Sequence, residues 1–156
     1  MTSGRAVALL LVPAAIALAV VLLVMRVRLE PPTVPTFELL DGGTAVLHPG
    51  GRFVMDVEPT SQLVGAIGVH AFLVQENTVR SWDPPVDVAR GGLVHIEGSV
   101  DRLFAGVPAG EWDVTLAVGR PETLPRAPVD VLQASGTDAA AAAWRLVRMH
   151  VRLAAQ

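Results

Sequence analysis

The pattern of apolar and polar positions changes once along the chain, at residues 26–35. Before this segment, residues 6–25 are continuously apolar and carry no charge. After it, short apolar stretches alternate with polar positions and are separated by turns rich in Gly and Pro. The first pattern is typical of a membrane-spanning helix and the second of β-strands. The sequence therefore predicts one transmembrane helix followed by a mainly β domain.

The apolar segment 6–25 is long enough to span a bilayer, because a helix of twenty residues extends about 30 Å. Arg5 flanks it on one side, and Arg26 and Arg28 flank it on the other. The alternative is a cleavable signal peptide, with Ala-Leu-Ala at 17–19 as its cleavage site. Apolar residues continue beyond this site without a polar region, which favours a retained anchor. A secreted module remains the alternative.

The segment 26–35 holds three prolines between positions 31 and 35 and predicts a stiff, extended stalk. The arginines on the two sides of the apolar segment nearly balance, so the positive-inside rule does not set the orientation. A stalk followed by a β domain is the layout of a domain held off a membrane surface. We therefore expect residues 1–5 to be a cytoplasmic stub and residues 36–156 to lie outside the cytoplasm.

Period-2 alternation predicts the strands of the domain, and it is clearest at residues 52–59. There Phe53, Met55 and Val57 occupy one face and mostly polar residues occupy the other. Residues 63–75 are apolar on both faces, which indicates a central strand. Further strands are predicted at 78–82, 93–98 and 112–119.

Gly and Pro divide the domain into short elements. Asp-Gly-Gly at 41–43 lies between two apolar stretches and predicts a hairpin joining 36–40 to 44–48. Residues 83–92 contain two prolines and two glycines and are predicted to interrupt regular structure. Pro128 favours one helical turn over 129–134, since proline is suited to the first position of a helix.

The C-terminal segment 144–153 fits two structures. As a strand, it places alternate apolar residues on one face; as a helix, it aligns Arg145, Arg148 and Arg152 in one stripe. The alanines at 139–143 favour the helix, whereas the alternation and the need for a closing strand favour β. We expect the strand. Seven to nine strands at this spacing predict an immunoglobulin-like β-sandwich over residues 36–156.

Charge excludes one class of partner. All twelve basic residues are arginine, a composition typical of a GC-rich bacterial genome. From Glu30 onward nine arginines face fifteen acidic residues, giving a net charge of −6. Nucleic acid requires a basic surface, so we expect no nucleic-acid partner. Cysteine is absent, which excludes disulfides, thiol nucleophiles and cysteine-rich zinc sites.

No motif for catalysis, a metal or a cofactor emerges from the sequence, so we expect a non-enzymatic protein without a cofactor. The four histidines lie far apart, and acidic pairs such as Asp56 with Glu58 are typical of any solvated strand face. The alternative is a metal-dependent or hydrolytic enzyme whose site combines His70, His95 and nearby carboxylates.

Five residues are candidates for a partner-binding surface. Two are tryptophans next to predicted loops, and three are arginines near the C-terminus; they are Trp82, Trp144, Arg145, Arg148 and Arg152. We nevertheless expect core or edge packing for the tryptophans and a solvated strand face for the arginines, with partner binding as the alternative. Trp112 alternates with apolar residues and is expected in the core.

The order of these segments resembles a known family. A membrane helix is followed by "RVRLEPPTVPTFEL", "GRFVMDVEP", "VGAIGVHAFLV", "GVPAGEWDVTLAVGRPETLP" and "WRLVRMHVRL". This layout is similar to the extracytoplasmic half of bacterial single-pass anti-sigma-like signalling proteins. In that family the cytoplasmic side carries a helical sigma-binding module, whereas only "MTSGR" precedes the helix here. The resemblance therefore implies an exported β domain and transfers no functional residue.

These observations combine into one functional expectation. We expect an anchored domain at the bacterial inner (cytoplasmic) membrane, held in the lipid bilayer through residues 6–25. The domain is expected to act outside the cytoplasm in binding or sensing, or as an accessory subunit of an envelope complex with an unidentified protein partner.

Overall fold

The computed structural model describes residues 34–40, 44–134 and 144–155. The chain divides into two compact units, Met1–Pro32 and Thr33–Gln156, and every described residue belongs to the second.

Several sequence predictions concern residues outside this described part. They are the cytoplasmic stub, the span 6–25, the flanking arginines Arg5, Arg26 and Arg28, and most of the stalk. Within the described residues, no helix has both the length and the apolar character needed to cross a bilayer.

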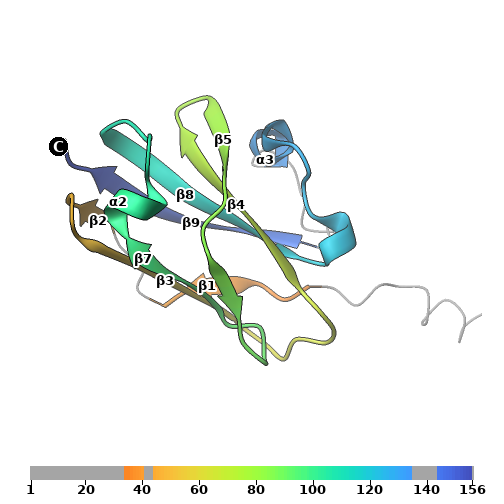
Figure 1. Ribbon diagram of the computed structural model, residues 1–156. Coiled ribbons are helices and arrows are strands. Elements are labelled where there is room, and N and C mark those ends of the chain that lie inside the picture. Colours follow the sequence, from red (N-terminus) through yellow and green to blue (C-terminus); the bar gives the residue numbers. More distant parts are fainter. Residues whose placement is uncertain (1–33, 41–43, 135–143, 156) are drawn as a thin grey trace, which may run out of the picture. The chain divides into compact units, whose positions relative to one another are not determined.

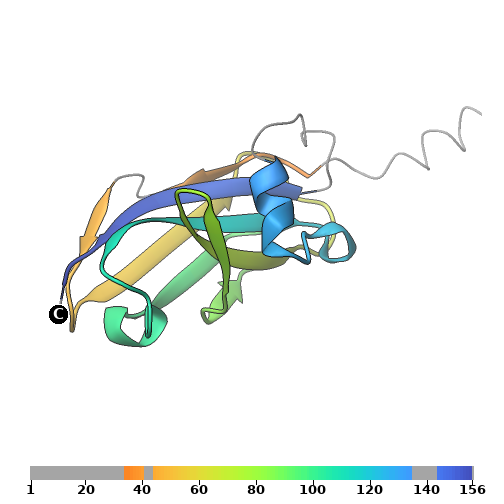
Figure 2. The same ribbon diagram turned by 90° about the horizontal axis from the view of Figure 1, so that it is seen from above.

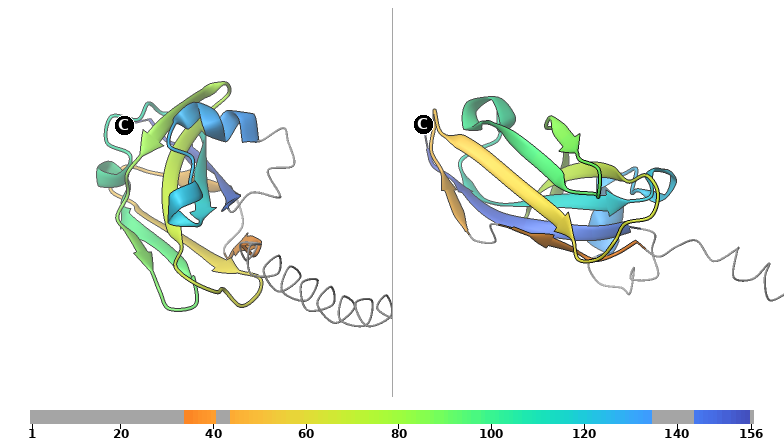
Figure 3. Two further views of the ribbon diagram at one scale, coloured as in Figure 1. Left: turned by 90° about the vertical axis from the view of Figure 1, so that its right-hand side faces the viewer. Right: turned by 90° about the horizontal axis from the view of Figure 1, so that it is seen from below.

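Nine strands of the described residues form two sheets that face each other (Figures 1 and 3). Sheet A contains, in spatial order, β1 (Phe37–Leu39), β3 (Arg52–Pro59), β7 (Val94–Ser99) and β6 (Val86–Val88). Sheet B contains β2 (Ala45–Leu47), β9 (Trp144–Leu153), β8 (Gly110–Gly119), β4 (Gly68–Gln75) and β5 (Thr78–Trp82). This division of consecutive strands between two sheets is that of an immunoglobulin-like sandwich, as the sequence predicted.

The predicted hairpin between 36–40 and 44–48 is wrong, because β1 and β2 belong to different sheets. β1 pairs antiparallel with β3, whereas β2 pairs parallel with the C-terminal end of β9. Phe37 and Leu47 are both buried in the core that the two sheets share. A local turn motif carries no information about such long-range contacts. β1 therefore lies at an edge of sheet A and β2 at an edge of sheet B.

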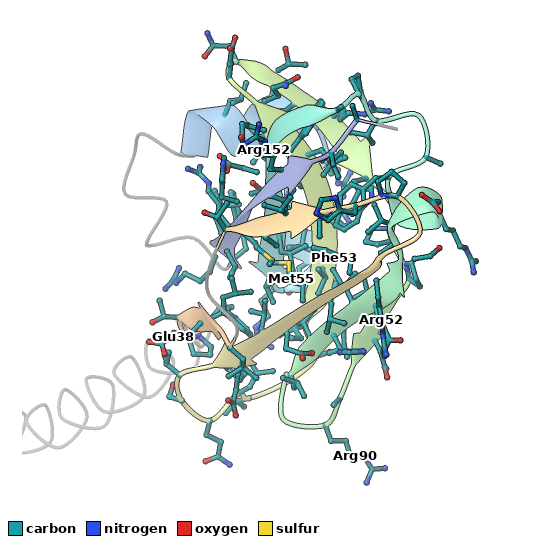
Figure 4. The ribbon with its side chains drawn as sticks, turned by 90° about the vertical axis from the view of Figure 1, so that its left-hand side faces the viewer. Glu38, Arg52, Phe53, Met55, Arg90 and Arg152 are labelled. Atoms are coloured by element: carbon teal, nitrogen blue, oxygen red, sulfur yellow. The ribbon has the colours of Figure 1, made fainter. Side chains whose placement is uncertain are left out.

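The core forms where the inward positions of the two sheets meet. On β3 the alternation holds over the whole predicted strand: Phe53, Met55 and Val57 are buried, while Arg52 is exposed. Figure 4 shows Phe53 and Met55 on the inner side of β3. Three aromatic rings pack together at one end, since Phe53 makes edge contacts with Trp82 and Phe104 at centroid distances of 6.0 and 5.4 Å.

Three short helical segments complete the described part. They are α2 (Val100–Leu103), η1 (Pro121–Thr123) and α3 (Pro128–Ala134). The predicted helical turn at 129–134 is confirmed, and the carboxylate of Asp130 accepts a hydrogen bond from the Ala127 amide at 3.1 Å. α3 lies against the outer face of sheet B (Figure 2). There Leu124 and Val131 pack with residues of the sheet as a second apolar cluster, which includes Phe72 and Ala117.

The remaining strand predictions have mixed outcomes. The closing strand 144–153 is confirmed and its helical alternative is wrong; residues 139–143 lie outside the described part. The central strand is confirmed but shorter, because only Gly68–Gln75 joins the ladders to β8 and β5. The segment 83–92 is not wholly irregular, since it contains β6 at the edge of sheet A, where proline and glycine neighbours are tolerated.

Candidate functional site

On the outer face of sheet A, His95 is surrounded by charged side chains. The ladder places His95 of β7 opposite Asp56 of β3. Its Nδ1 lies 2.5 Å from Asp56 Oδ1, and its Nε2 lies 3.3 Å from Oε2 of Glu97 on the same strand. Arg52 Nη2 lies 2.5 Å from the other oxygen of Glu97. Arg52, Asp56, His95 and Glu97 are called the His95 cluster.

A second cluster of the same design lies on the outer face of sheet B. His150 of β9 is opposite Asp113 of β8, and its Nδ1 lies 2.8 Å from Asp113 Oδ1. Its Nε2 lies 2.9 Å from Glu111 Oε2, and Arg152 Nε lies 3.4 Å from Glu111 Oε1. Glu111, Asp113, His150 and Arg152 are called the His150 cluster.

Both histidines are electrostatically perturbed in the same direction. The hydrogen bond to Asp56 raises the pKa of His95, with Glu97 acting in the same sense and partial desolvation opposing them. For His150, the hydrogen bond to Asp113 is the main cause that raises the pKa, and Glu111 adds to it. The hydrogen bond from Arg52 lowers the pKa of Glu97, and His95 contributes further. Each effect follows from stabilisation of the charged form by an opposite charge.

The sandwich is open at one edge of sheet B. β4 pairs with β8 from Gly68 onward, but its ladder to β5 begins only at Ala71. Among the described residues, no strand pairs with residues 68–70 on the side away from β8. After Trp82 the chain leaves sheet B and reaches sheet A as β6. Residues 68–70 of β4 therefore have no strand on this side within the described part of the chain, and they are called the free strand edge.

A cavity of about 270 Å³ lies next to this free edge. Its lining includes Ser81 of β5, Asp83 and the side chain of Arg126, which comes from the connection between η1 and α3. His70 also lines the cavity, and its Nδ1 lies 2.9 Å from the carbonyl oxygen of Pro125. Within the described residues, neither Asp83 nor Arg126 makes an ion pair. The edge and the cavity together are the candidate binding site.

A larger cavity, of about 390 Å³, lies at the end of the sandwich beside α2 and the C-terminal end of β9. Its lining is mostly apolar, including Leu47, Phe104 and Leu153. Its one carboxylate, that of Asp101, already accepts hydrogen bonds from the Gly50 amide at 3.1 and 3.0 Å. The one charged side chain among the described residues that line this cavity is therefore already engaged by the protein.

The tryptophans pack in the core or at a sheet edge, the role expected for them over surface anchoring. Trp82 is only 9% exposed, and its indole nitrogen donates a hydrogen bond to the Leu103 carbonyl at 2.7 Å, so most of its ring packs in the core, while the residue also lines the cavity beside the β4 edge. Trp144 is half-buried and packs against the second apolar cluster beneath α3. Trp112 is buried in the main core, as expected.

The three C-terminal arginines do not form one stripe. Arg148 and Arg152 are exposed on the outer side of β9, and Arg152 contacts Glu111. Arg145 belongs to the alternate side of the strand and is half-buried, with its Nη1 donating to the Trp144 carbonyl at 3.2 Å. The strand conformation therefore separates residues that a helix would have aligned.

The alternative enzyme site required His70 and His95 to converge. His70 belongs to β4 in sheet B, whereas His95 lies on the outer face of sheet A, so the core separates them. A site that combines these two histidines is therefore excluded. The described residues also contain no group of three or more side chains arranged to hold a metal ion.

The sequence missed both histidine clusters. It identified Asp56 and Glu58 as an acidic pair of a solvated strand face, but it joined neither carboxylate to a histidine. Alternation shows which side chains share a face, whereas the partner strand and its register decide which of them meet.

Comparisons with known proteins do not assign the chain to a family. No family model matches the chain, and no curated protein matches it. Among solved structures, the chain is similar to one described as the crystal structure of the Lin-41 filamin domain. The two are 12% identical with a TM-score of 0.39, and the match covers 77% of this chain and 98% of that chain.

Proposed function

We propose that this β-sandwich is the extracytoplasmic binding module of a single-pass protein of the bacterial inner membrane. In this proposal it binds an extended segment of an envelope protein, as a sensor or as an accessory subunit of an envelope complex, and it is not an enzyme. The observation that carries the proposal is the free edge of β4 at residues 68–70, with the cavity beside it.

A free strand edge presents backbone N–H and C=O groups without partners, and an extended peptide satisfies them by adding one more strand. The cavity next to the edge supplies side-chain recognition. Asp83 and Arg126 provide one negative and one positive group that are available to a ligand, and Ser81 adds a hydroxyl. A peptide strand with polar or charged side chains at alternate positions fits this arrangement.

The membrane part of the proposal rests on the sequence. Residues 6–25 have the length and apolarity of a spanning helix, and the proline-rich segment after them would hold the domain away from the bilayer. The resemblance in layout to extracytoplasmic halves of anti-sigma-like proteins supports the same orientation.

Photo-crosslinking in native membranes tests the proposal. A photoreactive amino acid at Ser81 of the full chain is expected to give a discrete adduct of higher mass with a membrane-fraction protein. Asp83→Arg in the same chain is expected to reduce this adduct at least tenfold, because it reverses a charge in the cavity. Glu38→Arg is the matched control, because it makes the same charge change away from the cavity. Glu38 lies on β1, at the edge of sheet A opposite to β6 (Figure 4), and this variant should leave the adduct intact.

The same preparation tests the anchor. Intact mass of the membrane-extracted protein should include residues 1–19, and their loss would establish the secreted alternative. Absence of an adduct at Ser81, or equal loss of it with Asp83→Arg and Glu38→Arg, would contradict binding at the β4 edge.

A further inference from the structure

The geometry of the two histidine clusters specifies a protonation state. Both ring nitrogens of His95 face carboxylate oxygens, and so do both ring nitrogens of His150. An ionised carboxylate only accepts hydrogen bonds, and a neutral imidazole has a single N–H to donate. Only the doubly protonated imidazolium donates to both of its partners. Both hydrogen bonds of each histidine can therefore form only when the ring is charged.

The charged groups around His95 favour its protonation. Asp56 and Arg52 approach from β3, Glu97 comes from its own strand, and Asp87 of β6 is opposite it in the ladder. Three carboxylates and one guanidinium therefore surround the imidazole. This negative surplus stabilises a proton on the ring.

The charged groups around His150 also have a negative net charge, but a smaller one. Glu111 and Asp113 approach from β8, and Glu76 of the β4–β5 turn lines the same hollow. On its own strand, Arg152 pairs with Glu111 and Arg148 is the next outward residue in the other direction. On β2, the outward residue Val46 pairs with Arg152 and is uncharged.

We propose that the His95 and His150 clusters are proton-dependent cross-strand links that make this domain responsive to pH. Protonated His95 joins β3 to β7 in sheet A through Asp56, and protonated His150 joins β8 to β9 in sheet B through Asp113. Loss of the proton leaves a ring lone pair facing a carboxylate in each sheet. Both sheets then lose a charge-assisted hydrogen bond in the same pH range.

The pH range follows from the direction of each pKa shift. A histidine whose folded-state pKa is raised stabilises the fold fully below its ordinary pKa of 6.5, and this contribution is lost as pH rises through the raised value. Glu97 has a lowered pKa, so its contribution is present above 4.5 and is lost as pH falls through the lowered value. The contributions of His95 and Glu97 are therefore both present between about pH 4.5 and 6.5, and the links through His95 and His150 weaken toward alkaline pH.

Nitrogen NMR of the full chain tests the protonation state directly. Two-bond ¹H–¹⁵N spectra of ¹⁵N-histidine-labelled protein in detergent micelles distinguish an imidazolium from the neutral tautomers. At pH 7.0 about three quarters of a free histidine is neutral. A larger imidazolium fraction than this is expected for His95 and His150, because their pKa values are raised above 6.5. Asp56→Asn should lower the titration midpoint of His95 only, and Asp113→Asn that of His150 only.

Unfolding experiments test the consequence for the fold. The urea midpoint of the full chain, followed by tryptophan fluorescence, is expected to fall between pH 6.5 and 8.5. The double variant His95→Gln, His150→Gln should lose most of this decrease, and each single variant should lose part of it. His48→Gln is the matched control, because His48 contacts no carboxylate among the described residues, and it should keep the wild-type decrease.

An acidic domain also gains stability in acid through reduced charge repulsion, so the variants and not the wild type alone decide the outcome. Titration midpoints of His95 and His150 at or below the ordinary value of 6.5 would overturn the proposal, as would a double variant with an unchanged pH dependence. If the double variant does not fold, the pH dependence of the single variants and the NMR titration test the same proposal.

Discussion

The outer faces of the two sheets carry similar histidine clusters but differ in what covers them. On sheet A the outer side of β3 stays polar along its length, and Val54, 38% exposed, is its one apolar residue. On sheet B the outer side of β9 changes along the strand. Trp144 and Leu146 pack beneath α3, whereas Arg148 and His150 further along are exposed. The outer face of sheet B is therefore apolar where α3 covers it and polar where it is exposed to solvent.

The largest expected effect comes from removing the apolar contact beneath that cover. Phe72 of β4 is 3% exposed and lies in the second cluster with Leu124 and Val131. Phe72→Ala should lower the free energy of unfolding by about 3–5 kcal/mol, the usual cost of emptying a buried phenylalanine site. Val54→Ala, on the uncovered sheet, should change it by no more than about 0.5 kcal/mol. Urea unfolding of both variants measures the difference.

Comparable costs for the two variants would break this contrast. They would mean that α3 does not seal the outer face of sheet B, and that Phe72 contributes no more than an exposed side chain.

A smaller effect of opposite sign is expected at Thr115, on the same outer face of β8. Its side chain is fully buried, and its hydroxyl oxygen has no hydrogen-bond partner among the described residues. A buried hydroxyl without a partner costs free energy, and valine has nearly the same shape. Thr115→Val should therefore stabilise the fold by about 1 kcal/mol in urea unfolding. Thr78→Val, at an exposed position of β5, is the control and should be near neutral. A destabilised Thr115→Val would show that the hydroxyl has a partner.

The elements that the sequence predicted best are those whose evidence is local. The alternation over 52–59 gave β3 with its bounds and its buried face. Apolar residues on both faces of the stretch 63–75 indicated a central strand. Both faces of β4 are indeed covered, because Leu73 faces the main core and Phe72 faces the cluster beneath α3.

The predictions that failed depend on partners far away in the sequence. The Asp-Gly turn suggested pairing of its two neighbours, but β1 and β2 each find a different partner, in different sheets. The position of Trp82 before a loop left a surface role open beside core packing; that loop is the crossing between sheets, and the ring packs against Phe104 of the α2 region. The histidine clusters required the register of β3 with β7 and of β8 with β9, which one strand at a time does not reveal.

The smallest expected effect distinguishes the two clusters by their arginines. Arg52 lies 2.5 Å from Glu97, whereas Arg152 lies 3.4 Å from Glu111, and all four side chains are substantially exposed. Exposed ion pairs contribute little to stability near neutral pH, so neither Arg52→Gln nor Arg152→Gln should measurably shift the urea midpoint there. Titration of the Glu97 carboxyl by carbon NMR is more sensitive. Arg52 is the main cause of the lowered pKa of Glu97, so Arg52→Gln should raise that pKa toward the ordinary value of 4.5. The contribution of Glu97 to stability would then be lost at a higher pH on acidification. Arg152→Gln, on the opposite sheet, should leave the Glu97 titration unchanged, and a shift of Glu97 in that variant would mean that the two outer faces are not electrostatically independent.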